Sequence, residues 1–211
     1  MWRELASALA DTLYMVSAST FFSVVFGFVT AVAMVLTRPG GLRPNAAAHT
    51  ALDLVVNLLR SFPFVILMIA IIPLTRFLAG TSIGSTASIV PLTVAATPFV
   101  ARIIEGSLLG VDPDVIEAAR SFGARDLQVV FGVMVREATP SIILDIAIVA
   151  VNLVGYSAMA GALGGGGLGD LAIRYGYNRF QTDIMVYSII VLIVVVQLIQ
   201  RTGTLLSRKI R

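Results

Sequence analysis

Very few residues of this chain have the chemistry that enzymes or metal sites use. The 211 residues include no cysteine, one histidine, His49, and one lysine, Lys209. Without cysteine there is no thiol chemistry and no cysteine-ligated zinc site. A Walker A loop needs a lysine directly after its glycines, and Lys209 lies instead in a basic C-terminal tail. The sequence therefore predicts no catalytic residue, cofactor site or metal site in this chain, and any ATP it uses must be bound by a partner.

Two glycine-containing segments look like catalytic signatures without meeting their requirements. Gly164–Gly169 fits a dinucleotide-binding G-x-G-x-x-G pattern, but no strand precedes it. We therefore expect a flexible loop there. Ser157 begins like the serine of a nucleophile elbow, but Met159 stands where the closing glycine would be. A serine nucleophile also needs a base, and the topology derived below separates His49 from Ser157 by the membrane.

A polar segment at residues 111–136 separates two apolar stretches. Asp112 is a suitable helix N-cap, Pro113 suits the first helical position, and Asp114 complements the positive end of a helix. Gly123 suits the left-handed position that ends a helix. These signals predict a helix of about nine residues, ~14 Å long. A second helix over residues 125–136 is expected to lead back to the membrane.

This short helix could serve as a docking element. Ala118 and Ala119 are small enough to allow close approach to a partner, and Glu117 offers a charge. The alternative is an amphipathic connector that rests on the membrane surface. The spacing of these residues alone leaves both interpretations open.

A polar stripe marks the apolar stretch that follows. At 100° per residue, five residues of a helix fall within an arc of about 60°: Ser141, Asp145, Asn152, Tyr156 and Met159. Polar side chains are expensive in lipid, so this face should meet protein or water. We favour the lining of a translocation path over buried hydrogen bonding between helices. Asp145 could equally pair with an arginine such as Arg102.

The elements that position these residues are membrane spans. Hydrophobic residues make up 57% of the chain and charged residues 13%, against about 25% charged in soluble domains. These values exclude a soluble domain and a disordered chain. A bilayer core ~30 Å thick takes about 20 helical residues. The apolar stretches predict an all-α, polytopic fold with five spans in a single domain over residues 1–211, at residues 12–37, 54–75, 85–107, 140–160 and 184–200.

Local signals refine three of these spans. The fourth should begin at Pro140, with Thr139 as its cap. On the third, Arg102 and Glu105 are three residues apart and can pair on one face of a helix. On the first, small residues recur every four positions at Ser19, Ser23, Gly27 and Ala31. Such a stripe lets helices approach closely, either within one chain or between two.

The basic residues give the expected orientation. Placing the N-terminus outside puts eleven on the cytoplasmic side and four outside. The eleven are Arg38, Arg43, Arg60, Arg102, Arg120, Arg125, Arg136, Arg201, Arg208, Lys209 and Arg211, and the four are Arg3, Arg76, Arg174 and Arg179. The positive-inside rule favours this orientation, with the 111–136 segment in the cytoplasm. It also explains the net charge of +3 without invoking nucleic acid.

The motifs together resemble one family of membrane proteins. Glu117-Ala118-Ala119 with Gly123 is similar to the "EAA" coupling loop of ABC-importer permeases. Other segments resemble the methionine branch in order and spacing, namely Arg60-Ser61-Phe62-Pro63-Phe64, Ile72-Pro73-Leu74-Thr75-Arg76, Gly80-Thr81-Ser82-Ile83-Gly84, Val90-Pro91-Leu92-Thr93, Pro98-Phe99-Val100-Ala101-Arg102, Leu153-Val154-Gly155-Tyr156-Ser157-Ala158-Met159, and Gly165–Gly169 with Tyr175-Gly176-Tyr177. The resemblance covers nearly the whole chain.

The resemblance implies a function and a set of partners. It implies the permease subunit of an ATP-driven importer in a bacterial inner membrane, with methionine, as the L- and possibly the D-isomer, as the expected substrate. Glu117, Ala118, Ala119 and Gly123 would couple it to the ATPase. The expected partners are a second copy of the chain, two ATP-binding subunits that hold ATP and magnesium, a substrate-binding lipoprotein outside, and membrane lipid. The alternatives are a permease for another amino acid or small organic solute, or a secondary transporter or channel without ATP coupling.

Overall fold

The computed structural model describes residues 2–210, and every regular element within that range is a helix or a helical turn. Arg211, which the sequence places on the cytoplasmic side, lies outside it. The elements are α1 (Trp2–Thr37), α2 (Ala46–Ser61), α3 (Phe64–Ala70), α4 (Ile72–Ala79), α5 (Ser85–Leu109), α6 (Pro113–Ser121), α7 (Asp126–Val129), the π-helical turn η1 (Val130–Met134), α8 (Val135–Ala162), α9 (Gly167–Leu171), the π-helical turn η2 (Ala172–Tyr177) and α10 (Thr182–Ile210). This confirms the all-α fold.

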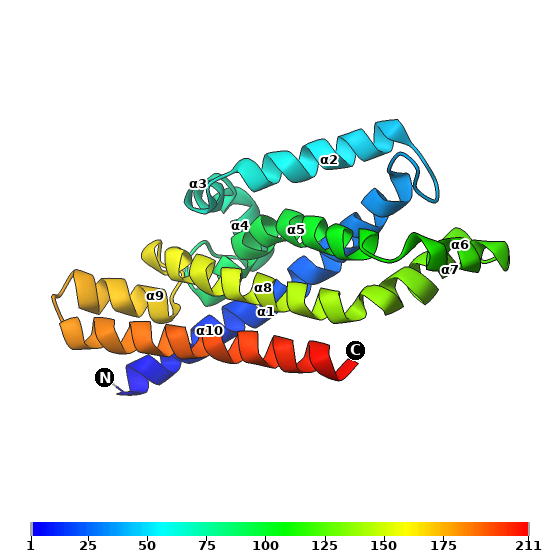
Figure 1. Ribbon diagram of the computed structural model, residues 1–211. Coiled ribbons are helices and arrows are strands. Elements are labelled where there is room, and N and C mark those ends of the chain that lie inside the picture. The colour runs from blue at the N-terminus through cyan, green and yellow to red at the C-terminus, as the bar shows by residue number, and fades with distance from the viewer. Residues whose placement is uncertain (1, 211) are drawn as a thin grey trace.

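Helix α5 lies at the centre, packed against α1 and α8, and α10 covers the outer side of α8 (Figure 1). The stripe of small residues on α1 is buried. A Cβ on Gly27 would lie 2.6 Å from the Val100 side chain of α5. The stripe therefore packs within the chain, which resolves an alternative that the sequence left open.

Among residues 2–210, four helical segments are long and apolar enough to cross a membrane, and a fifth crossing requires α2 and α3 to be one bent span. The prediction of one uninterrupted helical span over residues 54–75 is therefore wrong, because the helix is broken and bent within that range. The two helices meet at 103°, around Phe62, whose backbone is extended (φ −74°, ψ 127°). Pro63 causes this, because its ring disfavours a helical conformation at the preceding residue.

The predicted helix start at Pro140 is also wrong. A continuous helical segment runs from Asp126 through η1 to Ala162, and Pro140 lies inside α8. Thr139 is not a cap, because its hydroxyl donates to the Val135 carbonyl oxygen at 2.7 Å, one turn back in the same helix. The segment expected as a separate helix over 125–136 is thus the beginning of the same continuous helical segment.

The ends of the helices gather at two ends of the molecule. Figure 1 shows the N-terminus, α3 and α9 at one end, and the loop after α1 together with α6 and α7 at the other, towards which the C-terminus points. Helix α2 runs from the second end to the first, so Arg60 near its C-terminus belongs with α3. On the orientation expected from the sequence, Arg60 would then count on the outer side, and the bias of basic residues would be ten to five.

The glycine-rich segment is not the flexible loop that the sequence suggested. Its Leu168 is fully buried, and the Leu168 N–H donates to Thr12 Oγ1 at 2.9 Å. A Cβ on Gly169 would collide with the backbone of Ala158 in α8. The glycines therefore allow close backbone packing of α9 against α1 and α8.

Candidate functional site

Helix α6 is capped at both ends by the residues that the sequence indicated. Asp112 Oδ1 accepts from the Asp114 N–H at 2.9 Å, and Pro113 opens the helix. At the other end, Gly123 has φ +82°. Its N–H donates to the Arg120 carbonyl at 2.9 Å, and the Ala124 N–H donates to the Ala119 carbonyl at 3.2 Å. These two bonds form a Schellman motif, which fixes where the chain goes after α6.

The predicted coupling residues divide between two faces of α6. Ala119 packs with Ile116 against the main hydrophobic core, whereas Glu117 and Ala118 are exposed. Ala118 and Ala119 therefore do not share a docking face. Phe122, which the sequence pattern did not single out, is 92% exposed at the C-terminal end of the helix. A large apolar side chain in that position adds contact area for a partner.

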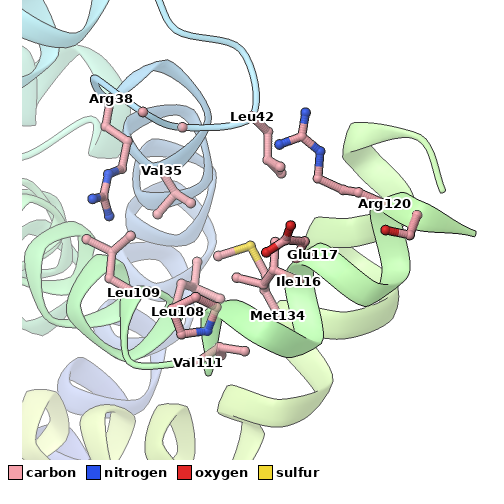
Figure 2. A pocket seen from close by; sticks show the side chains of 14 residues that line it. Val35, Arg38, Leu42, Leu108, Leu109, Val111, Ile116, Glu117, Arg120 and Met134 are labelled. Carbon is pink, nitrogen blue, oxygen red and sulfur yellow. The ribbon is translucent and has the colours of Figure 1, made fainter. Parts of the chain in front are cut away.

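One face of α6 borders a cavity of about 630 Å³. Pro113, Ile116, Glu117 and Arg120 of α6 line it, together with the ends of α1 and α5 and the loop after α1 (Figure 2). An ion pair between Arg43 Nε and Asp126 Oδ2, at 2.5 Å, joins that loop to the start of α7. The segment that follows α6 is thus tied to the loop after α1, while a cavity separates part of α6 from the ends of α1 and α5.

The five residues of the predicted stripe on α8 differ in how far they are exposed. Ser141, Asn152 and Met159 are exposed, while Asp145 and Tyr156 are half-buried. The Tyr156 ring stacks on Phe64 of α3, with ring centroids 4.9 Å apart and planes 5° apart. This exposed polar face would be costly against lipid, so it fits a contact with a second protein surface or with water.

Asp145 does not pair with Arg102. It accepts a hydrogen bond from Ser107 Oγ of α5 at 2.5 Å. Asp145 and Ser141 line a second cavity of about 600 Å³, to which Glu137 and Asp112 also contribute. The structure therefore brings the start of the stripe next to the N-cap of α6, whereas Asn152, Tyr156 and Met159 follow further along α8. Nothing in the sequence pattern pointed to Ser107.

Arg102 instead organises a polar network between α2 and α5. Its guanidinium binds Asp53 Oδ1 at 2.5 Å and Glu105 Oε2 at 2.9 Å. It also donates to Asn57 Oδ1 at 3.2 Å. The pairing with Glu105 confirms the prediction. Asp53 and Asn57 were missed, although their spacing of four in an apolar helix was a usable signal.

The described part of the chain, residues 2–210, contains no group of three or more histidine or acidic residues that could hold a metal ion. The acidic side chains at the second cavity come from two elements, α8 and the N-cap position of α6.

Comparison with known proteins gives consistent matches over the whole chain. The family described as binding-protein-dependent transport system inner membrane component matches residues 23–211. The probable D-methionine transport system permease protein MetI of Vibrio cholerae is 48% identical over 206 residues, which are 98% of this chain and 92% of that protein. The methionine import system permease protein MetP of Bacillus subtilis is 39% identical over 97% of this chain and 92% of its own length.

Solved structures match as well. An inward-facing structure of the MetNI methionine ABC transporter covers 100% of this chain and 97% of its own, with a TM-score of 0.98 and 42% identity. An amino acid ABC transporter that is 19% identical, with a TM-score of 0.80, shares the fold.

Proposed function

The chain belongs to the binding-protein-dependent transport system inner membrane components, and from this membership we propose that it is the permease of an ATP-driven methionine importer. Proteins of this family are membrane translocation components rather than enzymes. The observation that carries the proposal is α6, a nine-residue helix capped at both ends. It lies at one end of the molecule with Glu117, Ala118 and Phe122 exposed. A channel or secondary transporter has no use for such a docking helix.

The coupling role rests on Glu117, Ala118, Ala119 and Gly123. The exposed Glu117 and Ala118 would contact an ATP-binding subunit, which holds ATP and magnesium. Ala119 would anchor the helix to the permease core, and Gly123 would set its direction. Two such ATPase subunits and a substrate-binding lipoprotein complete the proposed importer.

The translocation path would run along the exposed face of α8 between two copies of the chain. A second copy would cover Asn152 and Met159 and remove the cost of exposing a polar side chain to lipid. Ser141 and Asp145 would lie at one end of this path, beside the second cavity, and Tyr156 further along. Alternating access would follow from movement of α6 with the ATPase.

The proposed orientation is N-terminus outside and C-terminus in the cytoplasm, in a bacterial inner membrane. The ten-to-five bias of basic residues supports it. It places α6 on the side where ATP is available.

The test is reconstitution of the full chain with its ATPase and binding protein in liposomes. We expect uptake of labelled methionine that requires internal ATP and is not competed by unrelated amino acids. Uptake driven by an ion gradient without the ATPase would contradict the importer assignment. ATP-driven uptake of a different amino acid in preference to methionine would contradict only the substrate.

The matched variants Ala118→Asp and Ala119→Asp test the assignment of faces on α6. The first places a charge on an exposed position, so the permease should stay stable but lose ATPase coupling. The second buries a charge against the core and should lower thermal stability. Equal stability of the two variants, or full coupling in Ala118→Asp, would contradict this assignment.

A further inference from the structure

The cavity beneath α6 holds two arginines that have no carboxylate partner. Arg38 directly follows α1 and is half-buried, and Arg120 lies in the last turn of α6. Both line the 630 Å³ cavity, and Figure 2 shows them to either side of Leu42. Within residues 2–210 neither guanidinium makes an ion pair, unlike Arg43 and Arg102 at the same end of the molecule.

The rest of the lining is mainly apolar. The cavity wall includes Val35, Leu42, Leu108, Leu109 and Met134. One carboxylate, Glu117, also faces it, so the charged lining carries one net positive charge. A ligand for this cavity should combine an anionic group with an apolar part.

The position of the cavity at the ends of α1 and α5 indicates where such a ligand would come from. Helix α5 has 25 residues and is therefore about 37 Å long, which exceeds a hydrocarbon core of ~30 Å. The cavity takes its apolar wall from the last turn of α5 and the last turn of α1. This position at the helix ends fits the level of the phosphate groups of a membrane leaflet.

We propose that this cavity binds an anionic phospholipid, with its phosphate between Arg38 and Arg120 and the beginning of an acyl chain against the leucines. Guanidinium groups suit phosphate, because their planar donors bind two oxygens at once. Basic pockets between helices at a cytoplasmic surface are typical sites for anionic headgroups. The lipid would connect α6 to α1 and so brace the coupling helix against the membrane.

Native mass spectrometry of the delipidated full-length chain would test this. Phosphatidylglycerol and phosphatidylcholine with identical acyl chains would be added separately. We expect clear preference for phosphatidylglycerol. Arg38→Gln and Arg120→Gln should each weaken its binding by about fivefold, since each removes one interfacial charge. Glu117→Gln should strengthen binding, because it removes the carboxylate that repels the phosphate.

The matched control is Arg136→Gln, an exposed arginine of α8 that does not line the cavity, and it should bind like the unmodified chain. Equal loss in this control, or unchanged binding when both cavity arginines are replaced, would overturn the proposal. Displacement of phosphatidylglycerol by an equal concentration of inorganic phosphate would show a free-anion site and overturn it as well. The measurement needs no transport, so its outcome is separate from that of the proposed function.

Discussion

Replacing Gly123 with valine should uncouple the permease from its ATPase without unfolding it. Gly123 has φ +82°, and a Cβ there would meet no atom within 4 Å. No steric clash contributes, so the whole penalty comes from the backbone conformation. A residue with a Cβ pays ~1–2 kcal/mol in the left-handed region, and a β-branched residue more.

The chain can escape that strain only by giving up the Schellman motif. The motif's two hydrogen bonds, to the Arg120 and Ala119 carbonyls, contribute about 0.5–1.5 kcal/mol each. The capped conformation should therefore be destabilised by about 1–3 kcal/mol, which lowers its population relative to uncapped conformations by a factor of roughly 5–150. Helix α6 contains no fully buried residue, so this loss remains local and the melting temperature should hardly change.

The assay is co-purification of the ATPase together with substrate-stimulated ATP hydrolysis. Gly123→Val should lose one or both, whereas Gly123→Asn should keep them, because asparagine tolerates the left-handed conformation. Gly106→Val is the matched control, since a Cβ there also meets no atom within 4 Å but its backbone is helical. Normal coupling in Gly123→Val, or equal loss in Gly106→Val, would refute the reasoning.

Three further outcomes are expected. Asn152→Leu should reduce transport while the assembled complex still hydrolyses ATP, whereas Ile193→Leu on the exposed face of α10 should transport normally; unchanged uptake in both would leave the stripe with a packing role. In this cysteine-free chain, a membrane-impermeant thiol reagent applied to intact cells should label Tyr177→Cys but not Asp114→Cys, and the reverse pattern would invert the topology. Gly27→Leu should lower thermal stability by about 1–3 kcal/mol through overpacking against α5, measurable as a lower melting temperature, and an unchanged value would contradict the tight contact.

The sequence was sufficient for α6 because every signal that forms it is local. Asp112, Pro113 and Gly123 act on neighbouring backbone groups, so their effects do not depend on the rest of the fold. The same kind of signal was overlooked at Pro63, where counting uncharged residues concealed the bend between α2 and α3. At Pro140 a local signal was misleading, because proline is also compatible with a helix interior when packing elsewhere offsets the lost hydrogen bond.

Contacts between distant segments could not be read from spacing. Ser107 bonds to Asp145 only because α5 and α8 pack side by side, although the partners are 38 positions apart in the sequence. Likewise, the helical period places Ala118 and Ala119 about 100° apart, but only the packed core decides which of the two faces inward. The polar character of the exposed face of α8 could be predicted from the sequence. The surface that covers this face could not, because it does not belong to the single chain.

The continuity of the fourth span changes how coupling would work. A break at Pro140 would have separated the coupling segment from the polar stripe by a hinge. The continuous course from Asp126 to Ala162 instead makes the start of α7 and the stripe parts of one helical segment. The Arg43–Asp126 ion pair fixes one end of it to the loop after α1, and the Tyr156–Phe64 stack connects its far half to α3. Displacement of α6 by an ATPase would therefore be transmitted to Tyr156 along one continuous helical segment.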